Sequence, residues 1–329
     1  MHAVALAGGV GAGKFLRGLV GVVRPEDVTV VVNTGDDIEV HGLHVSPDLD
    51  SVLYWLAGVM DRDRGWGRAG ETFRTTGELR RLGSDRAWFG LGDLDLATHL
   101  RRTTLLAGGM TLSEATATLA RGFEVPTRIL PMTDDPVTTR VETIGEEGHV
   151  LDLHFQEYWV QRGAQDHVRA IHYQGAAIAR PAPGVIEAIG AADCILICPS
   201  NPIASIDPIL AVPGIREGVR ERRERVVGIS PIVGGAPLRG MADKLLPVVG
   251  EEVSAAGVAH HYRDLLGAFV IDRVDADLAV EIGEELHGRP VLVVDTMMVD
   301  DETAREVAAA AVGAAMTNAD TADGRPEPR

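Results

Sequence analysis

Four aspartates lie within fifteen residues and follow closely on a glycine-rich segment. The aspartates are Asp36, Asp37, Asp48 and Asp50, and the segment is Gly8-Gly9-Val10-Gly11-Ala12-Gly13-Lys14. Glycines after a strand let backbone N–H groups approach an anion, and a helix that begins there turns its positive end toward that anion. Carboxylates repel phosphate unless a divalent cation lies between them. The pattern predicts chemistry on a phosphate ester with a bound metal ion.

The glycine-rich segment nearly matches two known nucleotide-binding patterns. Gly8 and Gly13-Lys14 fit a P-loop, but Phe15 stands where a Ser or Thr should bind magnesium. The dinucleotide fingerprint would need a third glycine at Lys14. We therefore interpret the segment as an anion-binding turn between a strand and a helix. The alternative is a tight turn that binds no ligand.

Composition excludes several classes of protein. A net charge of −17 excludes nonspecific nucleic-acid binding. The two cysteines, Cys194 and Cys198, share one short apolar run, so we expect small buried hydrophobes rather than a disulfide or a metal site. The N-terminus has no basic region or cleavage site, and no apolar run reaches membrane length, so we expect a cytoplasmic protein with no membrane partner.

Lysine is rare in this chain. Of 31 basic residues only Lys14 and Lys244 are lysines, and both stand beside glycine-rich loops. An ammonium is a compact charge suited to phosphate, so both are candidate phosphate ligands, although two lysines could also stand there by chance. The arginine bias is typical of a high-GC bacterium.

Short runs rich in Val and Ile alternate with helical patterns, which predicts an α/β fold with a Rossmann-like, doubly wound, mainly parallel sheet. A helix is predicted from Lys14 to Val22. The predicted strands are His2–Leu6, Val28–Val32, Thr127–Pro131, Cys194–Cys198, Val226–Ser230, Ala268–Asp272 and Val291–Val294.

Residues 1–317 are predicted to form one domain. The segment from about 51 to 125 has helical patterns and no good strand, so we interpret it as an inserted helical subdomain or lid. Residues 318–329 are polar and lack periodicity, which predicts a disordered tail.

Three further loops rich in Gly, Ser, Asn and Asp follow predicted strands. They are Pro131–Pro136, Pro199–Ile206 and Ser230–Pro237. In an open α/β sheet, ligands bind beyond the carboxyl ends of the strands. Together with Gly8–Gly11, these loops predict a shared nucleotide site.

The order of these motifs resembles the 2-phospho-L-lactate transferase family (CofD, called FbiA in actinobacteria), from Met1 to about Ala315. The matching motifs are Gly8-Gly9-Val10-Gly11, Asn33-Thr34-Gly35-Asp36-Asp37, Ser46-Pro47-Asp48-Leu49-Asp50, Pro131-Met132-Thr133-Asp134-Asp135-Pro136-Val137, His154-Phe155-Gln156-Glu157-Tyr158-Trp159-Val160, Pro199-Ser200-Asn201-Pro202 and Ser230-Pro231-Ile232-Val233-Gly234.

The resemblance implies an enzyme of coenzyme F-420 biosynthesis. Such an enzyme transfers a phosphoenolpyruvyl or 2-phospho-L-lactyl group from a guanylyl diphosphate donor to the ribityl hydroxyl of the deazaflavin Fo and releases GMP. It also implies Mg²⁺ and a homodimer. The arginine bias favours the enolpyruvyl donor of actinobacteria. The alternative is a nonenzymatic regulator that binds a nucleotide sugar, like the gluconeogenesis factors of similar fold.

The residue chemistry and the resemblance together predict roles for single residues. Asp50 and Asp48 are the predicted catalytic residues, and helix capping by either is the alternative. The predicted metal ligands are Asp36, Asp37 and Asp50. The predicted nucleotide-binding residues are Gly8, Gly9, Val10, Gly11, Lys14, Asn33, Thr34, Ser200, Asn201, Ser230, Gly234, Gly235 and Lys244.

One family feature is missing. Members of the family usually carry an arginine, attributed to acceptor binding, in the segment where this chain has Leu94 and Leu96. Arg86, Arg101 and Arg102 are the candidate replacements. His99 is either a polar group of the same site or a buried helix histidine, and Trp88 either stacks on the flat acceptor ring or packs in a core.

Overall fold

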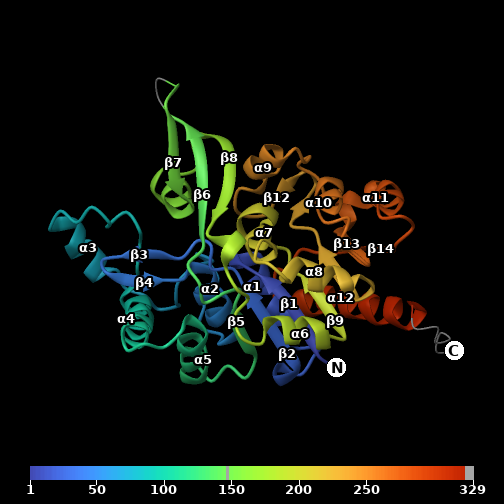
Figure 1. Ribbon diagram of the computed structural model, residues 1–329, viewed down its shortest axis with the longest axis horizontal. Helices are drawn as coiled ribbons and strands as arrows, with labels where there is room; N and C mark the ends of the chain where they lie inside the picture. The colour runs from blue at the N-terminus through green and yellow to red at the C-terminus, as the bar shows by residue number, and fades with distance from the viewer. Residues whose placement is uncertain (146–147, 323–329) are drawn as a thin grey trace.

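Seven parallel strands form the central sheet, in the spatial order β14-β13-β10-β9-β1-β2-β5 (Figure 1). The structure, a computed structural model, describes residues 1–145 and 148–322. Each predicted strand is present, and the doubly wound Rossmann-like fold is confirmed. In spatial order the strands are β14 (Val291–Val294), β13 (Ala268–Asp272), β10 (Val226–Ile229), β9 (Cys194–Ile197), β1 (Ala3–Ala7), β2 (Val28–Val32) and β5 (Arg128–Pro131).

The chain reverses its direction of travel across the sheet beside β1. It passes from β1 outward to β2 and β5, then returns to β9 on the other side of β1 and continues to β10, β13 and β14. The carboxyl ends of β1 and β9 are therefore the topological switch point, where open α/β sheets bind ligands. We call this place the switch-point edge.

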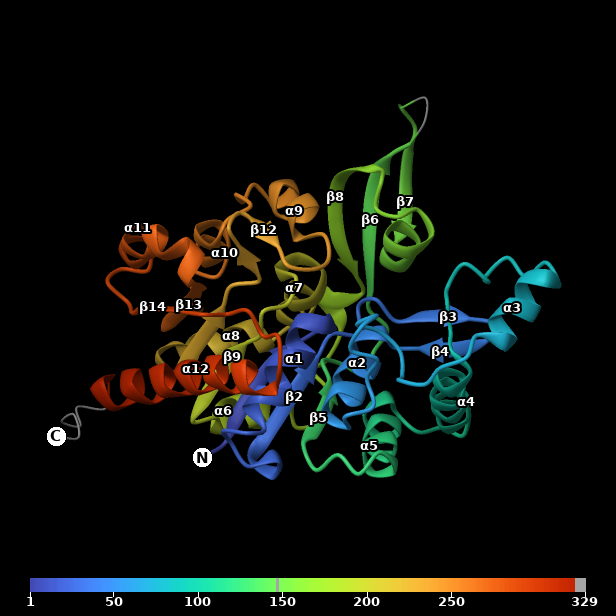
Figure 2. The same cartoon turned by 180° about the vertical axis from the view of Figure 1, so that it is seen from behind.

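Two helical layers cover the sheet. One face carries α1 (Gly9–Leu19), α2 (Pro47–Leu56), α5 (Leu112–Gly122) and α12 (Asp301–Ala322), which lie in front in Figure 2. The other face carries α6 (Val185–Ala191), α7 (Asp207–Leu210), α8 (Ile215–Glu221), α10 (Ala255–His261) and α11 (Ala279–Glu285).

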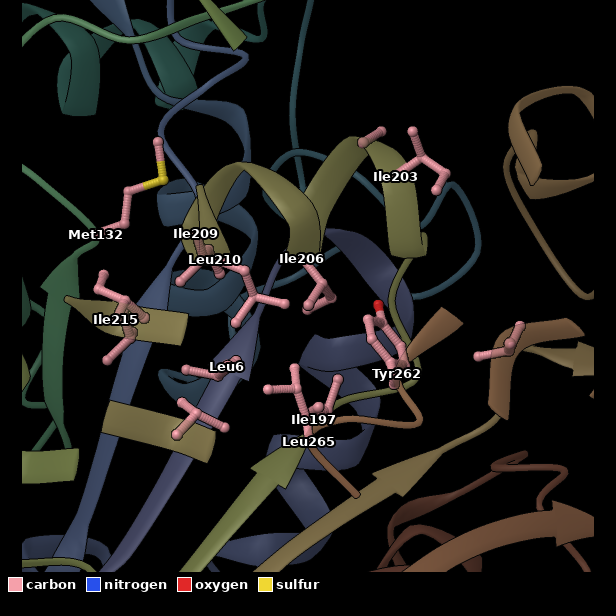
Figure 3. Close-up of a cluster of buried hydrophobic side chains, with 14 of the residues drawn as sticks. Leu6, Met132, Ile197, Ile203, Ile206, Ile209, Leu210, Ile215, Tyr262 and Leu265 are labelled. Carbon is pink, nitrogen blue, oxygen red and sulfur yellow. The ribbon is translucent and has the colours of Figure 1, made fainter. Parts of the chain in front are cut away.

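Each strand contributes side chains to the hydrophobic clusters on both faces of the sheet, because its successive side chains point to opposite faces. Leu6 of β1 lies in the cluster of the second face, shown in Figure 3 with Ile197 and Tyr262, whereas Ala5 and Ala7 lie in the cluster of the first face. Cys194 and Cys198 are buried free thiols, as expected from their apolar run.

The helical insertion is shorter than the predicted 51–125. Leu53 of α2 and Leu119 of α5 are buried in the same cluster as the strands, so both helices belong to the sheet layer. Outside that layer stand α3 (Arg74–Arg81) and α4 (Asp93–Ala107), together with a hairpin of β3 (Ile38–Val40) and β4 (Leu43–Val45) that precedes α2.

An antiparallel arm of three strands projects from the body in both views (Figures 1 and 2). It consists of β6 (Thr138–Ile144), β7 (Val150–His154) and β8 (His167–Gln174), in the order β7-β6-β8. The arm is not among the predicted strands, because in β6 buried residues alternate with more exposed ones rather than being apolar on both faces. Short elements follow β10, namely β11 (Ile232–Val233), β12 (Ala236–Pro237) and α9 (Ala242–Leu245).

The C-terminal helix corrects the predicted tail. The helix α12 continues through Asn318 to Ala322, and the Asn318 amide donates to the Gly267 carbonyl at 3.0 Å. The alanine-rich residues before the boundary favour the helix, and it continues past them for five residues. Residues 323–329 of the predicted tail lie outside the described residues. None of the helices within the described ranges has both the length and the apolar character needed to cross a membrane.

Candidate active site

The glycines after β1 meet the loop after β9 at the switch-point edge. The backbone N–H of Gly8 donates to the Ser200 hydroxyl at 3.3 Å. A Cβ on Gly11 would lie 2.1 Å from the Pro199 carbonyl oxygen, and a Cβ on Gly8 would lie 2.3 Å from a carboxylate oxygen of Asp48. Glycine is required at both positions because the backbone of another segment, or a buried carboxylate, occupies the space of a side chain.

The helix α1 begins at Gly9, five residues before the predicted start at Lys14. The amides of Val10 and Gly11 therefore belong to the first turn, where a helix has no acceptor of its own for its N–H groups. Lys14 lies on the second turn instead, and its ammonium donates to the Met298 carbonyl at 3.1 Å. The predicted cradle is thus a helix N-terminus rather than an extended loop.

Asn33 links the carboxylates at this end of the sheet. Its side-chain amide donates to Asp48 at 2.9 Å and to Asp36 at 3.3 Å. Asp48 also lies against the positive end of α1, next to Gly8 and Gly9. Asp48 is buried, and burial is the main reason that its pKa is raised to about 6, with the charge of Asp37 adding to the effect.

Asp36 and Asp37 form the other part of this group. The Gln156 amide, from the base of the arm, donates to Asp36 at 2.7 Å. One oxygen of Asp37 accepts from the Ser46 hydroxyl at 2.7 Å and contacts His44 at 2.9 Å. Burial raises the pKa of both carboxyls, and the charges of Asp48 and Asp37 raise that of Asp36 further.

The second oxygen of Asp37, Oδ1, is buried and has no hydrogen-bond partner within the part of the chain that the structure describes. A buried, unpartnered carboxylate oxygen is costly unless a cation or a donor reaches it. Asp36 and Asp48 are buried, and the charge of Asp37 raises the pKa of both. A divalent cation would relieve this repulsion.

Asp50 lies apart from the other three. Both of its carboxylate oxygens accept from the guanidinium of Arg102, one of them at 3.0 Å. The predicted trio Asp36, Asp37 and Asp50 is therefore not brought together, and within the described ranges no three His, Cys, Asp or Glu side chains are grouped closely enough to hold a metal ion. The capping alternative is not adopted either, because Ser46 is the N-cap of α2.

The structure distinguishes among the three candidate arginines. Arg86 contacts Glu157 at 3.4 Å, and Arg101 is exposed. Arg102 is only 1% exposed and pairs with Asp50. His99 is also buried, 3.5 Å from Asp50, and burial lowers its pKa to about 4. His99 is thus a neutral imidazole beside a buried ion pair.

Several predicted nucleotide ligands make contacts within the protein. The Asn201 side chain accepts from the amides of Ile203 and Ala204, and the Ser230 hydroxyl bonds the backbone of Ile232. Lys244 donates to the Ala164 carbonyl.

Gly234 and Gly235 adopt φ of +60° and +78° in the turn between β11 and β12. The Gly234 amide donates to Asp275 at 3.0 Å. Thr34 is buried, and its carbonyl accepts from the Asp37 amide at 3.2 Å, in the turn that carries the two aspartates.

Two other predicted features serve packing. The loop after β5 lies at the edge of the sheet, where Asp134 accepts from Ser113 at 2.7 Å and so holds α5. Trp88 packs on a small cluster that includes Val40 and Leu91, next to Phe89, which supports its core alternative.

Gln156, His44 and Ser205 were not singled out from the sequence, although each touches one of the aspartates. Gln156 lies 120 residues from its partner, so no local spacing pointed to it. His44 and Ser46 do stand within ten residues of Asp37, and that polar hairpin was the available signal.

Comparisons with known proteins show the family to which the chain is similar. The family model described as "2-phospho-L-lactate transferase CofD" matches residues 3–319. A phosphoenolpyruvate transferase of Streptomyces griseus is 50% identical over 306 residues, which covers 92% of this chain and 95% of that protein. A 2-phospho-L-lactate transferase of Methanosarcina acetivorans is 43% identical over 310 residues, covering 94% and 98%.

Among solved structures, a UPF0052 family protein of Bacillus halodurans has a TM-score of 0.59 at 17% identity and covers 94% of this chain and 98% of its own. At that identity the likeness concerns the fold alone.

Proposed function

The chain belongs to the 2-phospho-L-lactate transferase (CofD) family of enzymes, and we propose that it transfers a phosphoenolpyruvyl group from a guanylyl diphosphate donor to the ribityl hydroxyl of the deazaflavin Fo. In this reaction the hydroxyl oxygen forms a bond to the distal phosphorus. The bond from that phosphorus to the oxygen bridging the two phosphates breaks, and GMP leaves with that oxygen.

One observation carries the proposal, the position of Asp48 at the positive end of α1. A helix N-terminus at a switch point attracts phosphate, yet a buried carboxylate, Asp48, lies against the residues that begin α1. A diphosphate can approach Asp48 only if a cation lies between the two negative groups. The arrangement therefore suits a diphosphate donor that arrives with a divalent ion.

Asp36, Asp37 and Asp48 are not grouped closely enough within the described ranges to hold a metal ion by themselves, so the proposed Mg²⁺ would share its ligands between these carboxylates and the donor diphosphate. The unpartnered oxygen of Asp37, and the repulsion that its charge exerts on Asp36 and Asp48, favour a cation among oxygen ligands. When bound, Mg²⁺ supplies positive charge that stabilises the diphosphate and the leaving GMP. Asn33 holds Asp36 and Asp48 in place with its amide.

The buried pair of Asp50 and Arg102 belongs to the acceptor side of the proposal. The pair holds the Asp50 carboxylate in a fixed orientation, next to the ring of His99. A fixed carboxylate positions a hydroxyl group by accepting its hydrogen bond. In this proposal Arg102 is a positioning residue, because it orients the carboxylate of Asp50.

The enolpyruvyl donor is proposed over the lactyl donor. The relatives named phosphoenolpyruvate transferase reach 50% identity, whereas those named 2-phospho-L-lactate transferase reach 43%. A cytoplasmic homodimer is also part of the proposal, on the precedent of the family, and light scattering after size exclusion would test the dimer.

Mass spectrometry of the products tests the proposal. Purified protein with Mg²⁺ and Fo is incubated with the enolpyruvyl donor or with the lactyl donor. We expect the dehydro product and GMP, formed faster from the enolpyruvyl donor. Faster reaction of the lactyl donor would overturn the donor assignment, and donor binding without any product would favour the nucleotide-binding regulator.

A further inference from the structure

Four basic side chains gather beside α1. Lys14 and Arg17 are three positions apart, on neighbouring positions of the α1 surface. Arg17 and Arg62 both contact Asp301, each at 3.0 Å. Asp301 begins α12, three residues after Met298, whose carbonyl accepts from Lys14. These contacts place Lys14, Arg17 and Arg62 in one group.

Arg239, from the segment that follows β12, is the fourth member of the group. Its guanidinium donates to the carbonyls of Arg64 at 2.9 Å and Asp63 at 3.2 Å, next to Arg62 in the chain. Arg239 follows the loop after β10, whereas Arg62 follows α2, which packs against α1. The segment that carries Arg239 therefore reaches from β10 to the α1 side of the sheet.

The group has more positive than negative charge. In the contacts described above, Lys14 and Arg239 donate to backbone carbonyls, which carry no net charge. Arg17 and Arg62 share a single carboxylate, that of Asp301. Burial lowers the pKa of Lys14, and the two charged neighbours that lower it further are Arg239 and Arg62. In a chain of net charge −17, a local excess of positive charge favours an anionic ligand.

We propose that Lys14, Arg62 and Arg239 bind the anionic groups of the donor that lie beyond its guanosine 5′-phosphate. This inference rests on the proposed function, and it adds Arg62 and Arg239 as residues that bind the distal phosphate and carboxylate of the donor. The guanidinium of Arg239 is held by weak neutral acceptors, so an incoming phosphate or carboxylate offers it a stronger, charge-assisted bond.

Binding of GMP and GDP to Arg62→Gln and Arg239→Gln tests the inference. GDP carries the distal phosphate and GMP lacks it, and both are titrated calorimetrically with Mg²⁺ present. We expect the Kd for GDP to rise by about ten- to a hundredfold in each variant, and the Kd for GMP to change by less than about twofold. Arg239→Lys keeps the charge and is expected to fall between wild type and Arg239→Gln.

Arg223→Gln is the matched control. Arg223 also donates to two backbone carbonyls, those of Leu266 and Arg263, but it precedes β10 and so lies at the amino edge of the sheet. We expect it to change neither Kd. Thermal unfolding of all variants checks that the fold is retained.

The outcomes separate this inference from the proposed function. If wild type binds GDP more tightly than GMP and both arginine variants keep that preference, the inference is wrong and the proposed function stands. An equal loss of GMP and GDP binding would place the cluster at the first phosphate and also overturn the inference. If wild type binds neither nucleotide and forms no product, the proposed function fails, and the inference fails with it.

Discussion

The ion pair between Asp50 and Arg102 allows a quantitative test of the acceptor side. Arg102 is 1% exposed and donates to both oxygens of Asp50, so neither charge can turn to water when its partner is removed. Removing one partner of a buried pair costs about 3–5 kcal/mol. We therefore expect Asp50→Asn to fold, but to lose about that much of its free energy of unfolding.

A double-mutant cycle isolates the pair. Arg102→Met alone leaves Asp50 charged and buried, and we expect a similar loss. The double variant Asp50→Asn with Arg102→Met leaves no unpaired charge, so it is expected to recover at least about 2 kcal/mol relative to the sum of the single losses. Urea unfolding measures all four proteins, and an unchanged m-value would show that the unfolding transition is comparable.

The exposed pair of Arg140 and Asp152 is the control. The side chain of Asp152 is 50% exposed, so Asp152→Asn should cost less than about 1 kcal/mol. Turnover is measured in parallel, at a temperature where every variant is folded, and Asp50→Asn is expected to be inactive. A loss of less than about 1 kcal/mol in Asp50→Asn would refute the buried pairing. Near wild-type turnover with saturating Mg²⁺ would refute the catalytic role.

Three other predictions concern the donor side. A chelator should abolish activity while circular dichroism still reports a folded protein, and Mg²⁺ or Mn²⁺ should restore activity; full turnover in excess EDTA would contradict the carboxylate site. In metal-free protein, burial raises the pKa of Asp48 from the usual 3.8 to about 6, so wild type should lose stability as pH rises from about 4 through 6. Asp48→Asn cannot titrate, so it should be the more stable protein at about pH 8 but not at about pH 4, and parallel urea-unfolding stabilities would contradict this. Lys14→Ala should lower kcat/KM for the donor by about ten- to a hundredfold and leave Fo affinity unchanged; donor kinetics close to wild type would show that Lys14 is only a surface residue.

The central sheet was readable from the sequence because each of its strands carries its own signal. Val28–Val32 is apolar at four of five positions, since both faces of the sheet are covered by helices. The strands of the arm carry no such signal. In β6, Thr138, Arg140 and Glu142 alternate with buried residues, and the partner strands are recognised only once the arm has formed.

The carboxylates were found from their spacing, but their division into two groups was not. Asp48 and Asp50 are two residues apart on α2, which turns their side chains roughly 200° away from each other around the helix. Asp48 faces Asn33, and Asp50 faces Arg102 on α4. Only the packing of α4 against this part of the chain decides which arginine meets Asp50, and Arg102 is 52 residues away in sequence.

The contact between Gly8 and Ser200 also bears on how the protein is made. These residues are 192 positions apart, so β1 cannot pair with its neighbour β9 until the ribosome has synthesised the second half of the chain. At ribosomal speeds of about 5–20 residues per second, that wait is roughly 10–40 s. β1, β2 and β5 can pair during this interval, with the β9 side of β1 still exposed. We expect nascent chains arrested near residue 190 to bind chaperones that recognise open strand edges, and chains arrested beyond α12 to be released.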